Sequence, residues 1–128
     1  MKLAVNIAGG LLGLLFITFS LKVLLHLGPT PPLPPEGSPA ALFFGALFPT
    51  GYFKFVKVLE LFGGLLTAIP RTRNFGLLIL GPIIVNILAF HIFIMKGATL
   101  LDPPVIAISL LGAFLLWSGR KAFAGLAA

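Results

Sequence analysis

The chain has no cysteine and very few acidic residues. Its 128 residues include nine lysines or arginines but only three aspartates or glutamates, and 9% of the residues are charged. Without cysteine, the protein forms no disulfides, thiolate metal sites or thiol redox relays. A soluble domain carries about 25% charged residues, so this chain has too few to cover a water-facing surface.

Apolar residues take the place of the missing charges. They make up 59% of the chain, and the mean hydropathy is +1.13. These values predict an integral membrane protein with a single domain over residues 1–128. The net charge of +6 comes from scattered basic residues, which argues against a nucleic-acid partner and favours a role in membrane topology.

Four apolar segments are long enough, or nearly so, to cross the hydrocarbon core, which takes about 20 residues. We place the spans at about 3–27, 52–69, 75–95 and 104–123. Short loops make the last three antiparallel neighbours, and the first span closes the bundle. The first run lacks an A-x-A-like cleavage site, so we expect a retained helix rather than a signal peptide. The predicted fold is an all-α bundle of four transmembrane helices.

The connection between the first two spans contains a separate element. Residues 28–39 are rich in proline and favour an extended, polyproline-like loop. Ser38 is a suitable N-cap and Pro39 a suitable first residue for a helix over 40–48, which Pro49 should end. Such a helix is too short to cross a bilayer, so we expect it to be interfacial or re-entrant.

Basic residues near the span ends predict the orientation. Five of them fall on one side of a four-span bundle, whereas Lys96 lies on the other side with Glu36 and Asp102. The positive-inside rule then places both termini in the cytoplasm. We expect a multi-pass protein of a bacterial-type inner (cytoplasmic) membrane, surrounded by membrane lipid. The five basic residues are Lys2, Arg71, Arg73, Arg120 and Lys121.

Polar side chains within the spans form the candidate ligand-binding site. Three spans place ionisable or amide groups in the outer half of the bundle, and such groups normally face the bundle interior or a cavity. We expect one shared pocket that opens outward. Its candidate residues are Lys22, Lys57, Glu60, Asn86 and His91. The inner halves of the second and third spans offer little besides Thr67.

Spacing indicates how the helices pack. Gly9 and Gly13 form a GxxxG pair in the first span, which permits the close approach of another helix. Gly81 and Pro82 predict a kink in the third span. One face of the second span carries Lys57, Glu60, Gly64 and Thr67.

Each candidate residue also has a structural interpretation. Lys22 can extend to the membrane interface, and Glu60 can form an ion pair with Lys57 or with Lys22. We expect Asn86 and His91 to face protein rather than lipid, because an unsatisfied amide or imidazole is costly among acyl chains. Asn86 would then bond a neighbouring helix or a ligand. His91 would point toward Glu60 or the outer pocket, either as a satisfied buried group or as a ligand-binding or proton-carrying one.

No pattern for catalysis is present. The sequence has no phosphate-binding loop, no nucleophile elbow and no paired carboxylates. Two histidines with one nearby carboxylate make only a weak metal site. We therefore predict no catalytic and no metal-binding residues, and an enzymatic activity of the chain alone is not expected.

Residues 51–93 carry a set of motifs that resembles the DoxX-like family of small four-helix membrane proteins. The set comprises an initial G-Y, a K-V-x-E-x-x-G-G core that includes Lys57 and Glu60, and the run V-N-I-x-x-F-H that ends at His91. The first helix and the C-terminal WSGRKAF fit the same pattern, so the resemblance covers nearly the whole chain. It implies small subunits associated with a thiosulfate:quinone oxidoreductase or with other redox complexes.

These observations favour an accessory subunit of a redox or respiratory-type membrane complex, with a quinone or lipid in the outer pocket. Its partners would be other membrane-protein subunits or further copies of the chain. One alternative is a purely structural subunit packed against a larger membrane complex. Another is a component of a quinone-linked oxidoreductase, whose redox centre would come from a partner or a bound cofactor. A transporter is less favoured, because four helices rarely enclose a pathway without oligomerising.

Overall fold

The computed structural model describes residues 1–29 and 32–127, and all regular structure in them is helical. The main helices are α1 (Lys2–Leu24), α2 (Pro39–Thr50), α3 (Tyr52–Ala68), α4 (Arg73–Ala89) and α5 (Pro103–Ser118). The shorter ones are the 3-10 helix η1 (Pro70–Thr72), the π-helix η2 (Phe90–Ile94), α6 (Arg120–Ala124) and the 3-10 helix η3 (Gly125–Ala127). The all-helical fold class is confirmed.

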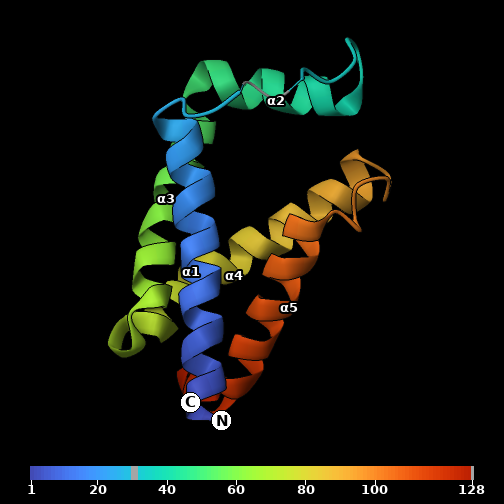
Figure 1. Cartoon of the computed structure of the whole chain (residues 1–128). Helices are drawn as coiled ribbons and strands as arrows, with labels where there is room; N and C mark the ends of the chain where they lie inside the picture. Colours follow the sequence, from blue (N-terminus) through green and yellow to red (C-terminus); the bar gives the residue numbers. More distant parts are fainter. Residues whose placement is uncertain (30–31, 128) are drawn as a thin grey trace.

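Four of the helices form a ring in which α1 packs on α3, α3 on α4, α4 on α5, and α5 on α1. This is the order that the short loops predict. The axis of α2 turns 83° from that of α3, so α2 lies across one end of the ring. Both termini lie at the opposite end (Figure 1). We call these ends the α2 end and the termini end.

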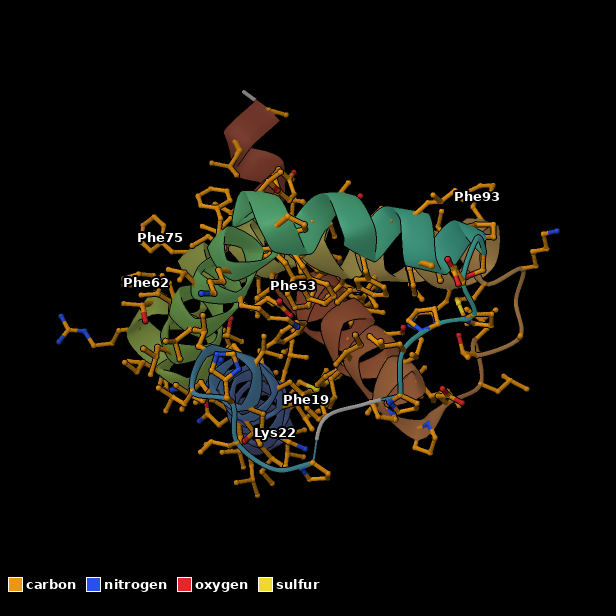
Figure 2. The ribbon with its side chains drawn as sticks, turned by 90° about the horizontal axis from the view of Figure 1, so that it is seen from above. Phe19, Lys22, Phe53, Phe62, Phe75 and Phe93 are labelled. Carbon is orange, nitrogen blue, oxygen red and sulfur yellow. The ribbon has the colours of Figure 1, made fainter. Side chains whose placement is uncertain are left out.

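Two helical segments of the described chain are long and apolar enough to cross a membrane, Lys2–Leu24 and Pro70–Ile94. The number rises to four if two bent pairs each count as one span, namely Pro39–Thr50 with Tyr52–Ala68 and Pro103–Ser118 with Arg120–Ala127. Figure 2 shows Phe62, Phe75 and Phe93 at the outside of the molecule, where they are 58%, 66% and 76% exposed. An apolar exterior and two to four candidate spans are typical of a helical membrane protein.

Three helix boundaries differ from the predicted bounds of the short helix and of the spans. The short helix is longer than 40–48 and includes Pro49, because a proline near a C-terminus removes only one helical bond. It ends at Gly51, whose φ of +80° suits glycine. The third span begins at Arg73 rather than residue 75. The fourth is not continuous over 104–123: the chain breaks at Gly119, and the segment beyond turns by 68°.

Glycines bring α1 and α3 into direct backbone contact. A Cβ added at Gly13 would lie 2.5 Å from the carbonyl oxygen of Gly64. The predicted face of α3 is confirmed, because Glu60, Gly64 and Thr67 are all buried. The centre of the ring is filled by apolar side chains from α1, α4 and α5, among them Leu12, Phe16, Leu77, Leu80 and Leu115.

Aromatic rings hold α2 across the end of the ring. Phe44 of α2 lies 5.9 Å from Phe53 of α3 and 5.4 Å from Phe90 of η2, measured between ring centroids. Phe43 and Phe48 make similar contacts with Phe90 and Phe53, at 5.1 and 4.7 Å. At the N-terminus of α2, the Ser38 hydroxyl accepts a hydrogen bond from the Ala41 amide, as the predicted cap requires. The contacts place α2 against the ends of both α3 and α4.

Candidate functional site

A cavity with a volume of about 410 Å³ lies at the α2 end. We call it the α2-end cavity. The proline loop, α2, η2 and the loop after η2 all contribute to its wall. The lining residues are Pro32, Pro34, Pro35, Ser38, Pro39, Ala40, Phe44, Phe90, His91, Ile94, Met95 and Thr99. The wall is therefore mostly apolar, with His91, Thr99 and Ser38 as its polar side chains.

The π-helix places His91 in this wall. A π-turn contains one more residue per hydrogen bond than an α-turn, which changes the direction of every side chain that follows. In η2 the Met95 amide bonds the Phe90 carbonyl, and the turn after it closes through Gly97, whose amide bonds the His91 carbonyl at 2.7 Å. This turn carries Thr99 back to His91, so that the His91 Nδ1 atom contacts the Thr99 hydroxyl. This contact uses Nδ1, and the His91 side chain is part of the cavity wall.

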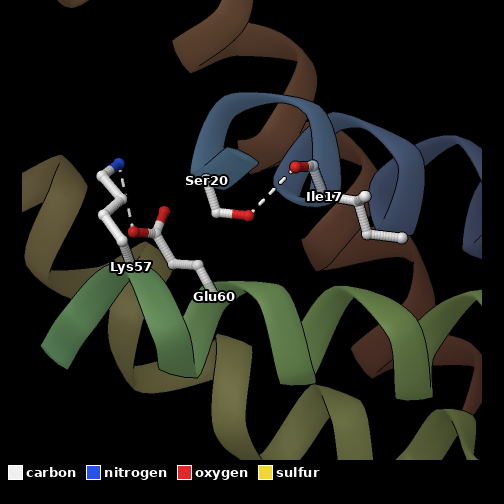
Figure 3. A network of polar contacts seen from close by, with 4 residues as sticks. All are labelled: Ile17, Ser20, Lys57 and Glu60. Atoms are coloured by element: carbon white, nitrogen blue, oxygen red, sulfur yellow. Dashed lines mark hydrogen bonds and ion pairs between the residues drawn. The ribbon is translucent and has the colours of Figure 1, made fainter. Parts of the chain in front are cut away.

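Glu60 does not line this cavity. It is 4% exposed and forms an ion pair with Lys57 on the same helix, with 3.1 Å between Lys57 Nζ and Glu60 Oε2. Figure 3 shows this pair beside Ser20 of α1, whose hydroxyl donates to the Ile17 carbonyl. The Lys57 ammonium also lies 5.1 Å from the centre of the Phe53 ring. Of the two partners considered for Glu60, the structure selects Lys57.

Lys22 and Asn86 both lie on the surface of the described chain. Lys22 is at the outer edge of α1 in the view from the α2 end (Figure 2), which agrees with its interpretation as an interfacial lysine. Asn86 is exposed, and its Nδ2 atom donates to the Pro82 carbonyl at 3.1 Å. The prediction that Asn86 faces protein and bonds a neighbouring helix is wrong for this chain. An asparagine in a helix can instead satisfy its donor at the carbonyl one turn back.

The predicted shared pocket is therefore divided. Of its five expected residues, only His91 lines the α2-end cavity, whereas Lys57 and Glu60 pair on α3. The reason is visible in Figure 1, where α4 leaves α3 toward the α2 end, so that the ends of the two helices lie far apart. The sequence analysis missed Thr99 and the aromatic wall. It treated the proline run only as a connection, although a rigid, apolar segment of this kind was the one available indication of a cavity wall.

A second polar group lies at the termini end, where the sequence analysis expected little besides Thr67. Arg73 is only 6% exposed. Its Nε and Nη2 atoms donate to the carbonyls of Thr67 and Ala68 at the end of α3, at 2.8 and 3.4 Å, and Nη1 donates to the Asn6 side-chain oxygen at 2.9 Å. The guanidinium lies against Gly9, where a Cβ would come within 2.1 Å of Nε. Arg73 thus links three helices by hydrogen bonds, and it is also one of the basic residues near a span end.

The residues of the α2-end cavity are of a kind that can bind a ligand. Within residues 1–29 and 32–127, no group of three His, Cys, Asp or Glu residues is placed to hold a metal ion. The cavity has flat aromatic and proline surfaces beside one imidazole, an arrangement that can hold a flat ring and bond its edge. No protein-family model, curated protein or solved structure matches this chain.

Proposed function

We propose that this protein is a small accessory subunit of a redox-type membrane complex and that it holds a quinone-class amphiphile in the α2-end cavity. The observation that carries the proposal is the cavity itself, with Phe44 and Phe90 in its wall and His91 beside Thr99. The resemblance to the DoxX-like family supports the redox context. In this proposal His91 is the residue that bonds the ligand, and Lys22, Lys57, Glu60 and Asn86 are not.

The chemistry of a quinone fits these surroundings. A quinone head group is a flat ring whose carbonyl oxygens accept hydrogen bonds, and its tail is apolar. The imidazole Nε2 and the Ser38 hydroxyl are donors of the required kind, while the rings offer stacking surfaces. Ligand cavities usually measure about 300–1,000 Å³, and the volume of about 410 Å³ lies within this range.

The proposal includes four spans with both termini cytoplasmic. One support is that the number of candidate spans rises to four when each bent pair counts as one span. Another is the group of basic residues near the termini end. In this proposal α2 lies at the interface and α3 crosses the bilayer. The 17 residues of α3 rise about 26 Å, close to the hydrocarbon thickness of about 30 Å. With this orientation the α2-end cavity opens at the outer surface, within reach of a quinone in the bilayer.

Bound quinone can be measured directly. The protein is purified in mild detergent from membranes that contain quinone, and the extract is quantified by mass spectrometry. Wild type should carry quinone, and His91→Phe should lose most of it with little loss of stability. A matched control is Phe93→Leu, because Phe93 lies two residues further along η2 but is 76% exposed, outside the cavity. Wild-type protein without quinone, or equal retention in His91→Phe, would refute the proposal.

A purely structural subunit is the second candidate, and the exposure of Asn86 favours it. An amide on the apolar outer face of α4 can bond a helix of a neighbouring subunit. Asn86→Leu should then weaken co-purification with the larger complex while leaving the stability of the isolated chain nearly unchanged. This result together with an empty α2-end cavity would support the structural role over the binding role.

A further inference from the structure

Among the residues that the structure describes, none is an acidic partner of the buried Arg73. The chain has three acidic side chains, Glu36, Glu60 and Asp102. Glu60 pairs with Lys57, and the other two lie in the loops of the α2 end. All three groups that accept hydrogen bonds from Arg73 are uncharged. A buried charge normally needs a partner of opposite sign, and none of the described acidic side chains supplies one to Arg73.

Arg73 also retains unused donors. A guanidinium has five N–H bonds, and three hydrogen bonds are formed with Thr67, Ala68 and Asn6. Arg73 lies in the wall of a second cavity, of about 230 Å³, which we call the termini-end cavity. Arg73 therefore borders a space that a small ligand can enter.

The wall of the termini-end cavity contains both polar and apolar side chains. Its polar part consists of Arg73, Asn74 and Ser118, and its apolar part includes Val5 and Leu77. Arg73 is the first residue of α4, so the partial positive charge of the helix N-terminus adds to that of the guanidinium. A polar end of this charge beside apolar side chains fits a phosphate group attached to a hydrocarbon chain.

We propose that the termini-end cavity binds a phosphate group through the Arg73 guanidinium, supplied either by the head group of an anionic membrane lipid or by free phosphate. Arginine binds phosphate well because its planar fork matches two phosphate oxygens. The exposed basic residues Arg120 and Lys121 would attract the anion to this end of the protein. The site is separate from the α2-end cavity and does not depend on its ligand.

Asn74→Asp is the decisive variant. It places a carboxylate in the cavity wall with almost no change in shape, and the new charge repels an anion. Acidic residues are favoured in the first turn of a helix, so folding should be preserved. Arg71→Gln changes the net charge by the same amount but at an exposed position, and it is the matched control.

The probes are dioleoyl phosphatidic acid and dioleoylglycerol, which share their acyl chains and differ in the phosphate. Binding to full-length protein in detergent is measured by native mass spectrometry, and melting temperatures verify folding. Wild type and Arg71→Gln should bind phosphatidic acid equally. Asn74→Asp should bind it at least about tenfold more weakly, as expected for the loss of a charge-assisted contact. Dioleoylglycerol should bind weakly to all three.

Inorganic phosphate as a competitor identifies the source of the group. Displacement of phosphatidic acid by phosphate alone shows a site for the free anion, whereas resistance to displacement shows that the lipid chains are needed; both results support the phosphate site. Equal binding by Asn74→Asp and wild type, equal losses in Asn74→Asp and Arg71→Gln, or equal affinity for the two lipids would overturn the proposal.

Discussion

Replacing Gly13 with alanine tests the glycine contact between α1 and α3. The new Cβ would lie 2.5 Å from the Gly64 carbonyl oxygen and 2.8 Å from Ala68 Cβ. Ordinary contact begins at 3.4 Å, so the helices must separate by about 0.9 Å here, the difference between 3.4 and 2.5 Å. Both obstructing atoms belong to the backbone or are attached to it, so no side-chain rotation relieves the clash.

The magnitude follows from two opposing terms. Overpacking of a close contact costs about 1–3 kcal/mol, whereas alanine is favoured over glycine within a helix by about 0.8–1 kcal/mol. Gly10→Ala is the matched control, because nothing lies within 4 Å of a Cβ at that position. Gly10→Ala should gain only the stabilisation that comes from the higher helix propensity of alanine. The difference in unfolding free energy between the two variants therefore isolates the overpacking term, about 1–3 kcal/mol.

The assay is reversible unfolding in mixed micelles, followed by circular dichroism as the fraction of denaturing detergent increases. Wild type, Gly10→Ala and Gly13→Ala are compared at the same protein concentration. Gly13→Ala should unfold at the lowest fraction of denaturing detergent and Gly10→Ala at the highest. If Gly13→Ala is as stable as Gly10→Ala, α1 and α3 do not meet at these glycines.

Two further predictions concern the ion pair and the topology. Glu60→Gln leaves the Lys57 ammonium without its partner and should lower the unfolding free energy by about 1–3 kcal/mol. The double variant Lys57→Met with Glu60→Gln should recover most of this loss in the same assay. A double variant that is no more stable than Glu60→Gln would argue against the pair. Reporter fusions at residue 74 and at the C-terminus should both give a cytoplasmic signal, and a signal from the opposite side at either position would contradict the four-span topology.

Periodicity, composition and loop length predict those features that depend on residues close together in the sequence. The buried face of α3 follows from the spacing of Glu60, Gly64 and Thr67, and the start of α2 follows from Ser38 and Pro39. The order of helices around the ring follows from loop length, because a short loop leaves few partners within reach. Each of these depends on residues that are close together in the sequence.

The candidate site was harder to predict because it depends on how the helices are staggered and rotated. Asn6 and Arg73 are 67 residues apart, and no pattern in the sequence relates them. The direction of His91 depends on η2, where the angle of 100° between successive residues of an α-helix no longer applies. Glu60 pairs with Lys57 on α3, whereas His91 lines the α2-end cavity, because α4 diverges from α3 toward that end.

The three hydrogen bonds of Arg73 have a mechanical consequence. They fasten α1, the end of α3 and the start of α4 at one point, so α4 can pivot there more easily than it can slide. His91 lies 18 residues beyond Arg73, a rise of about 27 Å, and each degree of tilt therefore moves it by about 0.5 Å. Such a lever turns small rotations at the termini end into changes in the width of the α2-end cavity.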